Sequence, residues 1–186
     1  AVFGTGELAN AFKVAAQVPT LIYDMLIGGL LSSALVPVFS GYAERDDRND
    51  LWRLASLFVT LAVVVLSVIA ALVALLAPEI AALIVSGYSA EQQALVAQLI
   101  RVVSPSIIFF GISGSLTGLL YALKRFNFAA FAAAIYNVGV IIGAVLLSQG
   151  FEGQGRVIGL TLGVVLGSLM QLTLLLPDLR DIPLRA

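Results

Sequence analysis

Long uncharged stretches, separated by short charged segments, form the main pattern along this chain. Four stretches contain no Asp, Glu, Lys or Arg: residues 54–77, 102–123, 126–151 and 157–177. A bilayer core about 30 Å thick needs about 20 helical residues, so each stretch is long enough to cross a membrane as a helix. Two further apolar stretches flank Asp24, and they form one long span if Asp24 lies inside the membrane.

The pattern therefore predicts an all-α, polytopic transmembrane helix bundle. We expect about five membrane-spanning helices, over about residues 8–42, 50–85, 91–123, 127–149 and 155–177. Strands of a membrane barrel would be shorter and would alternate apolar and polar residues. Residues 61–74 (LAVVVLSVIAALVA) show no such alternation, which favours helices.

Composition leads to the same class of protein. Hydrophobic residues make up 60% of the 186 residues and charged residues only 11%, whereas soluble domains are about 25% charged. The formal net charge is −1, so the chain has no basic excess for binding nucleic acid. It has no Cys and no His, and no P-loop motif. These absences remove thiolate catalysis, Cys-ligated metals and the commonest metal ligand and general base, so we predict no metal, no cofactor and no enzyme.

The distribution of Lys and Arg predicts the orientation of the helices. Three connections fall on one side of the membrane: 43–53, 124–125 and 178–186. They hold seven Lys or Arg residues, whereas the connections on the other side hold only Arg156. Cytoplasmic loops of membrane proteins carry the excess of positive residues, so we place the first set in the cytoplasm.

Glycines recur every four residues in three predicted spans: Gly114 and Gly118, Gly139 and Gly143, and Gly159, Gly163 and Gly167. Residues spaced by four share one helix face, and small side chains there let two backbones approach closely in lipid. The spacing predicts helix–helix contacts.

One face of the first predicted span is polar although the rest of that span is apolar. At about 100° per residue, five positions lie close to one line along the helix: Asn10, Lys13, Gln17, Asp24 and Gly28. Charges inside a membrane face a bundle interior or a water-filled cavity, so these residues are candidates for lining a substrate cavity. The alternative is that Lys13 and Asp24 lie near the two ends of the span and extend to the membrane surfaces.

Other spans contribute fewer candidates. Arg101 shares a face with Ser104 and is either a cavity ligand or an interfacial anchor. Asn137 lies in the middle of the fourth span, where an interhelical hydrogen bond is favoured over substrate contact. Pro19 and Pro105 lie inside predicted helices and predict kinks, which makes both candidate hinges.

Three motifs resemble a known family. Residues 10–19 (NAFKVAAQVP), residues 32–37 (SSALVP) and Tyr42 resemble the second helix of the MurJ/MviN family. Phe3-Gly4-x-Gly6 resembles the end of that family's first helix. Arg125-Phe126, Phe131 and Asn137 resemble the segment that enters its fifth helix. The similarity runs over nearly the whole chain.

The resemblance implies a lipid flippase with two helical lobes around a central cavity, working by alternating access. The substrate implied is lipid II, the undecaprenyl-pyrophosphate-linked peptidoglycan precursor, moved from the inner to the outer leaflet of a bacterial cytoplasmic membrane for cell-wall synthesis. Residues 1–186 would then be part of the N-terminal lobe, without its first helix and without the C-terminal lobe. Its partners would be membrane lipids, the lipid-linked glycan and the remainder of the full-length chain.

The chain differs from the family pattern at the polar face. The family often has Asp at position 10, a basic pair at Tyr23-Asp24 and Glu at position 28. One hypothesis is that Lys13 and Arg101 supply the positive charge that the basic pair would provide. Alternative functions are a flippase for another polyprenyl-linked glycan, a non-transporting scaffold for cell-wall assembly, and a drug or cation antiporter that uses Asp24.

Overall fold

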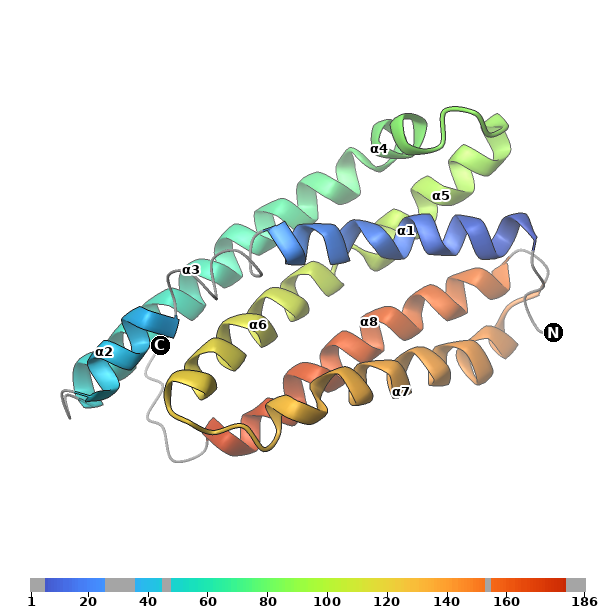
Figure 1. The fold of residues 1–186 in the computed structure, drawn as a ribbon. Helices are drawn as coiled ribbons and strands as arrows, with labels where there is room; N and C mark the ends of the chain where they lie inside the picture. The colour runs from blue at the N-terminus through green and yellow to red at the C-terminus, as the bar shows by residue number, and fades with distance from the viewer. Residues whose placement is uncertain (1–5, 26–35, 45–47, 153–154, 180–186) are drawn as a thin grey trace.

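The structure, a computed structural model, describes residues 6–25, 36–44, 48–152 and 155–179 (Figure 1). Every regular element in these ranges is a helix. The α-helices are α1 (Glu7–Tyr23), α2 (Val36–Glu44), α3 (Arg48–Leu75), α4 (Ala77–Ile84), α5 (Ala90–Val103), α6 (Ser106–Ala122), α7 (Ala132–Val145) and α8 (Arg156–Leu175). Short 3-10 helices precede and follow α7 (η3, Ala129–Phe131; η4, Leu147–Gly150) and follow α8 (η6, Leu176–Leu179).

Helices of membrane-spanning length confirm the predicted all-α transmembrane bundle. Within the described ranges, three stretches are long and apolar enough to cross a bilayer: Trp52–Leu75, Ala129–Gly150 and Arg156–Leu179. The pair α5 and α6 makes a fourth if it is one span, bent by 43°. The predicted first span, 8–42, includes residues 26–35, which lie outside the described ranges, so its continuity stays a prediction.

Two predicted helices are each divided in two, which corrects the sequence-based boundaries. The predicted helix 50–85 ends its first part at Leu75 and resumes at Ala77 as α4, with Pro78 in the first turn. The predicted helix 91–123 bends at Ser104 and Pro105, between α5 and α6. Proline has no N–H and its ring clashes with the preceding turn, so it breaks or bends the helix.

The α3 helix has one lipid-like face and one buried face. Its buried side chains, such as Leu66 and Ala70, join a core with α1, α4 and α5. Its opposite face exposes large apolar side chains at spacings of three and four residues: Leu57, Leu61, Val64, Val68 and Leu72. An exposed apolar face of this length is what contact with lipid requires.

Helices α7 and α8 lie side by side and run antiparallel (Figure 1). Their glycines face each other: a Cβ added at Gly163 would lie 2.7 Å from the Gly143 Cα, and one at Gly139 would collide with the Gly167 backbone. Near the end of the pair, a Cβ at Gly159 would lie 2.5 Å from the Ser148 Cα. The predicted glycine contacts are therefore confirmed for these two helices.

The α1 helix packs against α5, α6 and α8 (Figure 1). Ala11 and Ala15 on its buried face are almost inaccessible. These small side chains let α1 approach its neighbours, and that approach directs the opposite face of α1 outward.

We predict that Gly163→Ala destabilises the protein, because the added methyl group meets backbone atoms that cannot rotate away. Overpacking of this kind typically costs about 1–3 kcal/mol. The measurement is the thermal denaturation midpoint of the purified full-length protein. The matched control is Gly41→Ala, since a Cβ at that helical glycine meets nothing within 4 Å. Equal midpoints for the two variants would contradict the proposed packing.

Candidate functional site

The polar face of α1 is open in the described part of the chain. Asn10, Lys13 and Gln17 are exposed, whereas Ala11 and Val18 are buried. The helical phase predicted from the sequence therefore persists along α1. Pro19 does not end the helix, and it lies on the buried side.

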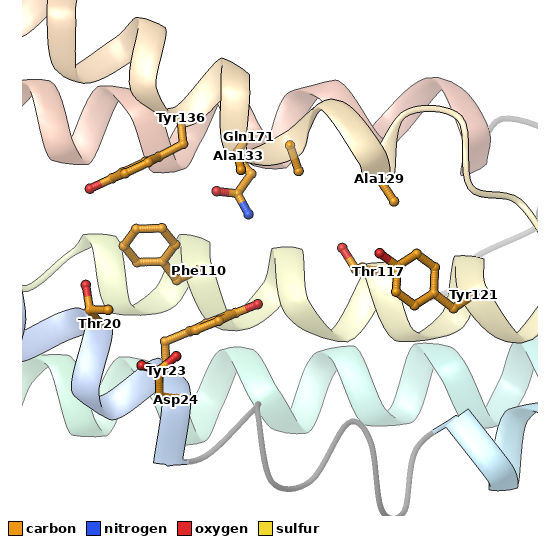
Figure 2. Close-up of a pocket in the computed structure, with 11 residues that line it drawn as sticks. Thr20, Tyr23, Asp24, Phe110, Thr117, Tyr121, Ala129, Ala133, Tyr136 and Gln171 are labelled. Atoms are coloured by element: carbon orange, nitrogen blue, oxygen red, sulfur yellow. The ribbon is translucent and has the colours of Figure 1, made fainter.

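A cavity of about 370 Å³ lies at the C-terminal end of α1, between α1, α6, α7 and α8 (Figure 2). Its lining combines aromatic rings, hydroxyl groups, one amide and one carboxylate with three small alanines. The lining residues are Thr20, Tyr23, Asp24, Phe110, Thr117, Tyr121, Ala129, Ala132, Ala133, Tyr136 and Gln171. Asp24 is the one charged residue in this described lining.

Several polar groups in the cavity have no hydrogen-bond partner among the described residues. They are the hydroxyl groups of Tyr23, Thr117, Tyr121 and Tyr136 and the amide of Gln171. Thr20 differs, because its hydroxyl donates to the Ala16 carbonyl oxygen at 3.1 Å. Figure 2 shows the Thr117 and Gln171 side chains directed into the space between α6 and the α7–α8 pair, while the Tyr23 ring lies over α6 in this view. Unpaired polar groups at membrane depth are costly unless water or a ligand binds them.

Three aromatic rings form a row along the cavity. The Tyr23 and Phe110 ring centroids are 5.8 Å apart, and those of Phe110 and Tyr136 are 5.3 Å apart. Both pairs are tilted by about 55°, within the range of favourable aromatic contacts. The row connects α1 to α7 through α6 and fixes the position of the two tyrosines.

Of the candidates predicted from the sequence, Asp24 lines this cavity. Asn10, Lys13 and Gln17 lie on the exposed face of α1 and do not line it, and Gly28 lies outside the described residues. Asn137 is exposed on α7, and its Nδ2 donates to the Ala133 carbonyl oxygen of the same helix at 2.9 Å. Asn137 therefore forms a hydrogen bond within its own helix, and not the bond between helices that the sequence favoured.

Arg101 has a different environment from the cavity. Its Nε donates to the Ala74 carbonyl oxygen at 3.2 Å. That oxygen would normally accept from the N–H of residue 78, but residue 78 is proline and has none. Arg101 thus binds the carbonyl group that the break between α3 and α4 leaves free.

The Arg101 backbone takes part in the second break. Its own carbonyl loses its helical donor to Pro105, and the Ser104 Oγ donates to it at 2.9 Å. The chain bends by 43° at this point. Pro105 therefore lies at a bend, as its position in the sequence predicts, while a hinge motion there stays a prediction.

The sequence reasoning missed most of the cavity residues. Tyr136 and Gln171 are polar positions inside predicted spans, which is the signal that selected Asn137. The sequence marks Tyr23 only as a difference from the family pattern. Their proximity depends on the pairing of α1, α6, α7 and α8, which hydropathy does not encode.

The chain is similar to known proteins over its whole length. The family model described as Lipid II flippase MurJ matches residues 1–186. A protein of Burkholderia cenocepacia named Lipid II flippase MurJ is 26% identical over 182 residues, 97% of this chain and 35% of the relative. A protein of Bdellovibrio bacteriovorus named Probable lipid II flippase MurJ is 28% identical, over 94% of this chain and 34% of the relative. A protein of Vibrio cholerae with the same name is 27% identical, over 96% of this chain and 35% of the relative. The chain thus spans about 35% of the length of these relatives.

We predict that Arg101→Met and Pro78→Ala are coupled in their effect on stability. In Pro78→Ala the Ala74 carbonyl regains a backbone donor, so the loss of Arg101 should cost less there. A coupling energy of about 0.5–1.5 kcal/mol is expected for one net hydrogen bond. The measurement is a double-mutant cycle on the unfolding free energy of the full-length protein.

The control cycle pairs Arg101→Met with Pro19→Ala, because Arg101 does not bind the carbonyl group that Pro19 leaves free. That pair should be additive. Additivity in both cycles would mean that Arg101 does not compensate for Pro78.

Proposed function

Because the chain belongs to the lipid II flippase MurJ family, we propose that it forms part of the N-terminal lobe of a membrane flippase that moves lipid II to the outer leaflet by alternating access. The polar face of α1 would line the hydrated path between the two lobes. In broken-helix transporters, such paths lie at the interface of two moving halves. The remainder of the full-length chain would supply the second lobe.

One observation supports this proposal most directly. Asn10, Lys13, Gln17 and Asp24 are exposed on α1, whereas the face that carries Ala11, Ala15 and Val18 is packed inside the bundle. A charge at the centre of a membrane helix costs about 2.5–3.5 kcal/mol on insertion scales, so such a face is not stable against lipid. A water-filled cavity or a second lobe satisfies these groups.

The proposal includes a location and an orientation. We place the protein in the bacterial cytoplasmic membrane, because it belongs to this flippase family. The excess of Lys and Arg places the connections at 43–53, 124–125 and 178–186 on the cytoplasmic side. The C-terminal end of α1 and its cavity would then lie toward the cytoplasm.

We predict that single cysteines at positions 10, 17 and 24 react with a membrane-impermeant thiol reagent. The chain has no Cys, so each variant carries one reporter in this region. The full-length protein, freed of any other cysteine, is labelled in membranes opened to the reagent on both sides.

Two controls separate water access from simple exposure. Ala15→Cys lies on the buried face of α1, with 0% exposure. Leu61→Cys is 58% exposed on the lipid-like face of α3. Both should be protected, because a thiol in lipid or in the core does not meet the reagent. Protection at positions 10, 17 and 24 as well would rule out the hydrated path.

The transport function itself is tested by depleting the full-length protein in its own cell. We predict that lipid II then accumulates in the inner leaflet and falls in the outer leaflet, measured by leaflet-resolved quantification. Re-expression of the wild-type protein is the control. An unchanged distribution in a cell without another flippase would favour a different glycan lipid or a scaffold role.

A further inference from the structure

We propose that the cavity between α1, α6, α7 and α8 binds the neutral sugar part of a lipid-linked glycan, and not its pyrophosphate. This inference rests on the proposed function, and it assigns one part of the substrate to one set of side chains.

The charge of the cavity argues against pyrophosphate. Asp24 is on the rim, and no Lys or Arg is among the described lining residues. A dianionic group beside a carboxylate is repelled. A neutral ligand carries no such cost.

The polar groups of the cavity match a sugar in kind and number. Three tyrosine hydroxyls and the Thr117 hydroxyl each donate and accept, and the Gln171 amide does both through its two ends. A sugar ring presents the same mixture of donors and acceptors on its hydroxyl and acetamido groups. No hydrogen bond joins these side chains to another described residue, so within the described part of the chain their polar groups are available to a ligand.

The aromatic row supplies a second element of sugar recognition. Tyr23, Phe110 and Tyr136 line the cavity, and their rings pack on one another in a row, with centroids 5.8 and 5.3 Å apart. The C–H face of a pyranose is apolar and packs against such surfaces, while its hydroxyl groups bind at the edges. Two of the three rings also carry a hydroxyl group, so each offers an apolar body and a polar tip.

The size of the cavity limits the ligand. About 370 Å³ is near the lower end of the range of about 300–1,000 Å³ for small-molecule sites. This space suits part of a glycan headgroup and excludes a long prenyl chain. Aromatic rings with one carboxylate also suit an ammonium group, but five neutral hydrogen-bonding groups against one carboxylate favour the sugar.

The test measures the binding of two lipids to the purified full-length protein by native mass spectrometry. Lipid II carries the sugars with their peptide, whereas undecaprenyl pyrophosphate has the same prenyl chain and pyrophosphate without either. The variants are Tyr136→Phe, which removes one oxygen atom, and Gln171→Leu. Matched controls are Tyr88→Phe and Gln98→Leu, since neither residue lines this cavity.

Each cavity variant should weaken lipid II binding by about 3- to 10-fold, the effect of one lost hydrogen bond. The same variants should leave undecaprenyl pyrophosphate binding unchanged, and the controls should change neither. Denaturation midpoints show whether each variant is folded. If Gln171→Leu does not fold, Tyr136→Phe alone is enough to test the inference.

Other outcomes overturn the inference in distinguishable ways. If wild-type protein prefers lipid II but the cavity variants bind it normally, the sugar binds elsewhere and the proposed function stands. If the variants weaken both lipids equally, the cavity does not recognise the sugar. If wild-type protein binds neither lipid, the proposed function fails and this inference fails with it.

Discussion

The need to pair every backbone carbonyl in a medium without water determines much of this structure. Pro78 and Pro105 each remove a donor from a helix, and each freed carbonyl finds a replacement nearby. The Arg101 guanidinium binds the Ala74 oxygen, and the Ser104 hydroxyl binds the Arg101 oxygen. Because Arg101 contributes its side chain to one break and its backbone to the other, the positions of α4 and of the α5–α6 bend are linked. A movement at either break disturbs the hydrogen bond at the other.

Close packing on one side of the bundle leaves room on another. The glycines of α7 and α8 bring the two backbones into contact, and at Gly167 that contact is with the backbone of Tyr136. Tyr136 is thereby fixed at a point where its ring extends toward Phe110 and the cavity. Gln171 follows Gly167 by four residues, about one turn of α8, and lines the same cavity. The packing that stabilises the helix pair therefore also positions two of the cavity's polar groups.

The fold was largely readable from the sequence, whereas the cavity was not. Uncharged stretches of about 20 residues and glycines every four residues are local signals; the first is confirmed in α3, α7 and α8, and the second in α7 and α8. The break at Leu76 was missed because a single proline near a span's end was outweighed by the hydropathy around it. Asp24 was found because charge inside a span is conspicuous. Tyr136 and Gln171 were not, since a moderately polar residue in a span has many packing roles and only the arrangement of four helices brings these two together.

The exposed face of α1 carries two opposite charges, Lys13 and Asp24, and this polarity bears on how a substrate would lie. Lys13 is the seventh residue of α1, nearly two turns from the N-terminus. Asp24 follows the last turn, 11 residues later, about 16 Å along the axis. On the proposed function, an anionic group is favoured toward Lys13 and is disfavoured beside Asp24. The neutral part of the same substrate would then meet the hydroxyl groups and aromatic rings around Asp24, so Lys13 and Asp24 would separate the binding of charge from the binding of sugar along a single helix.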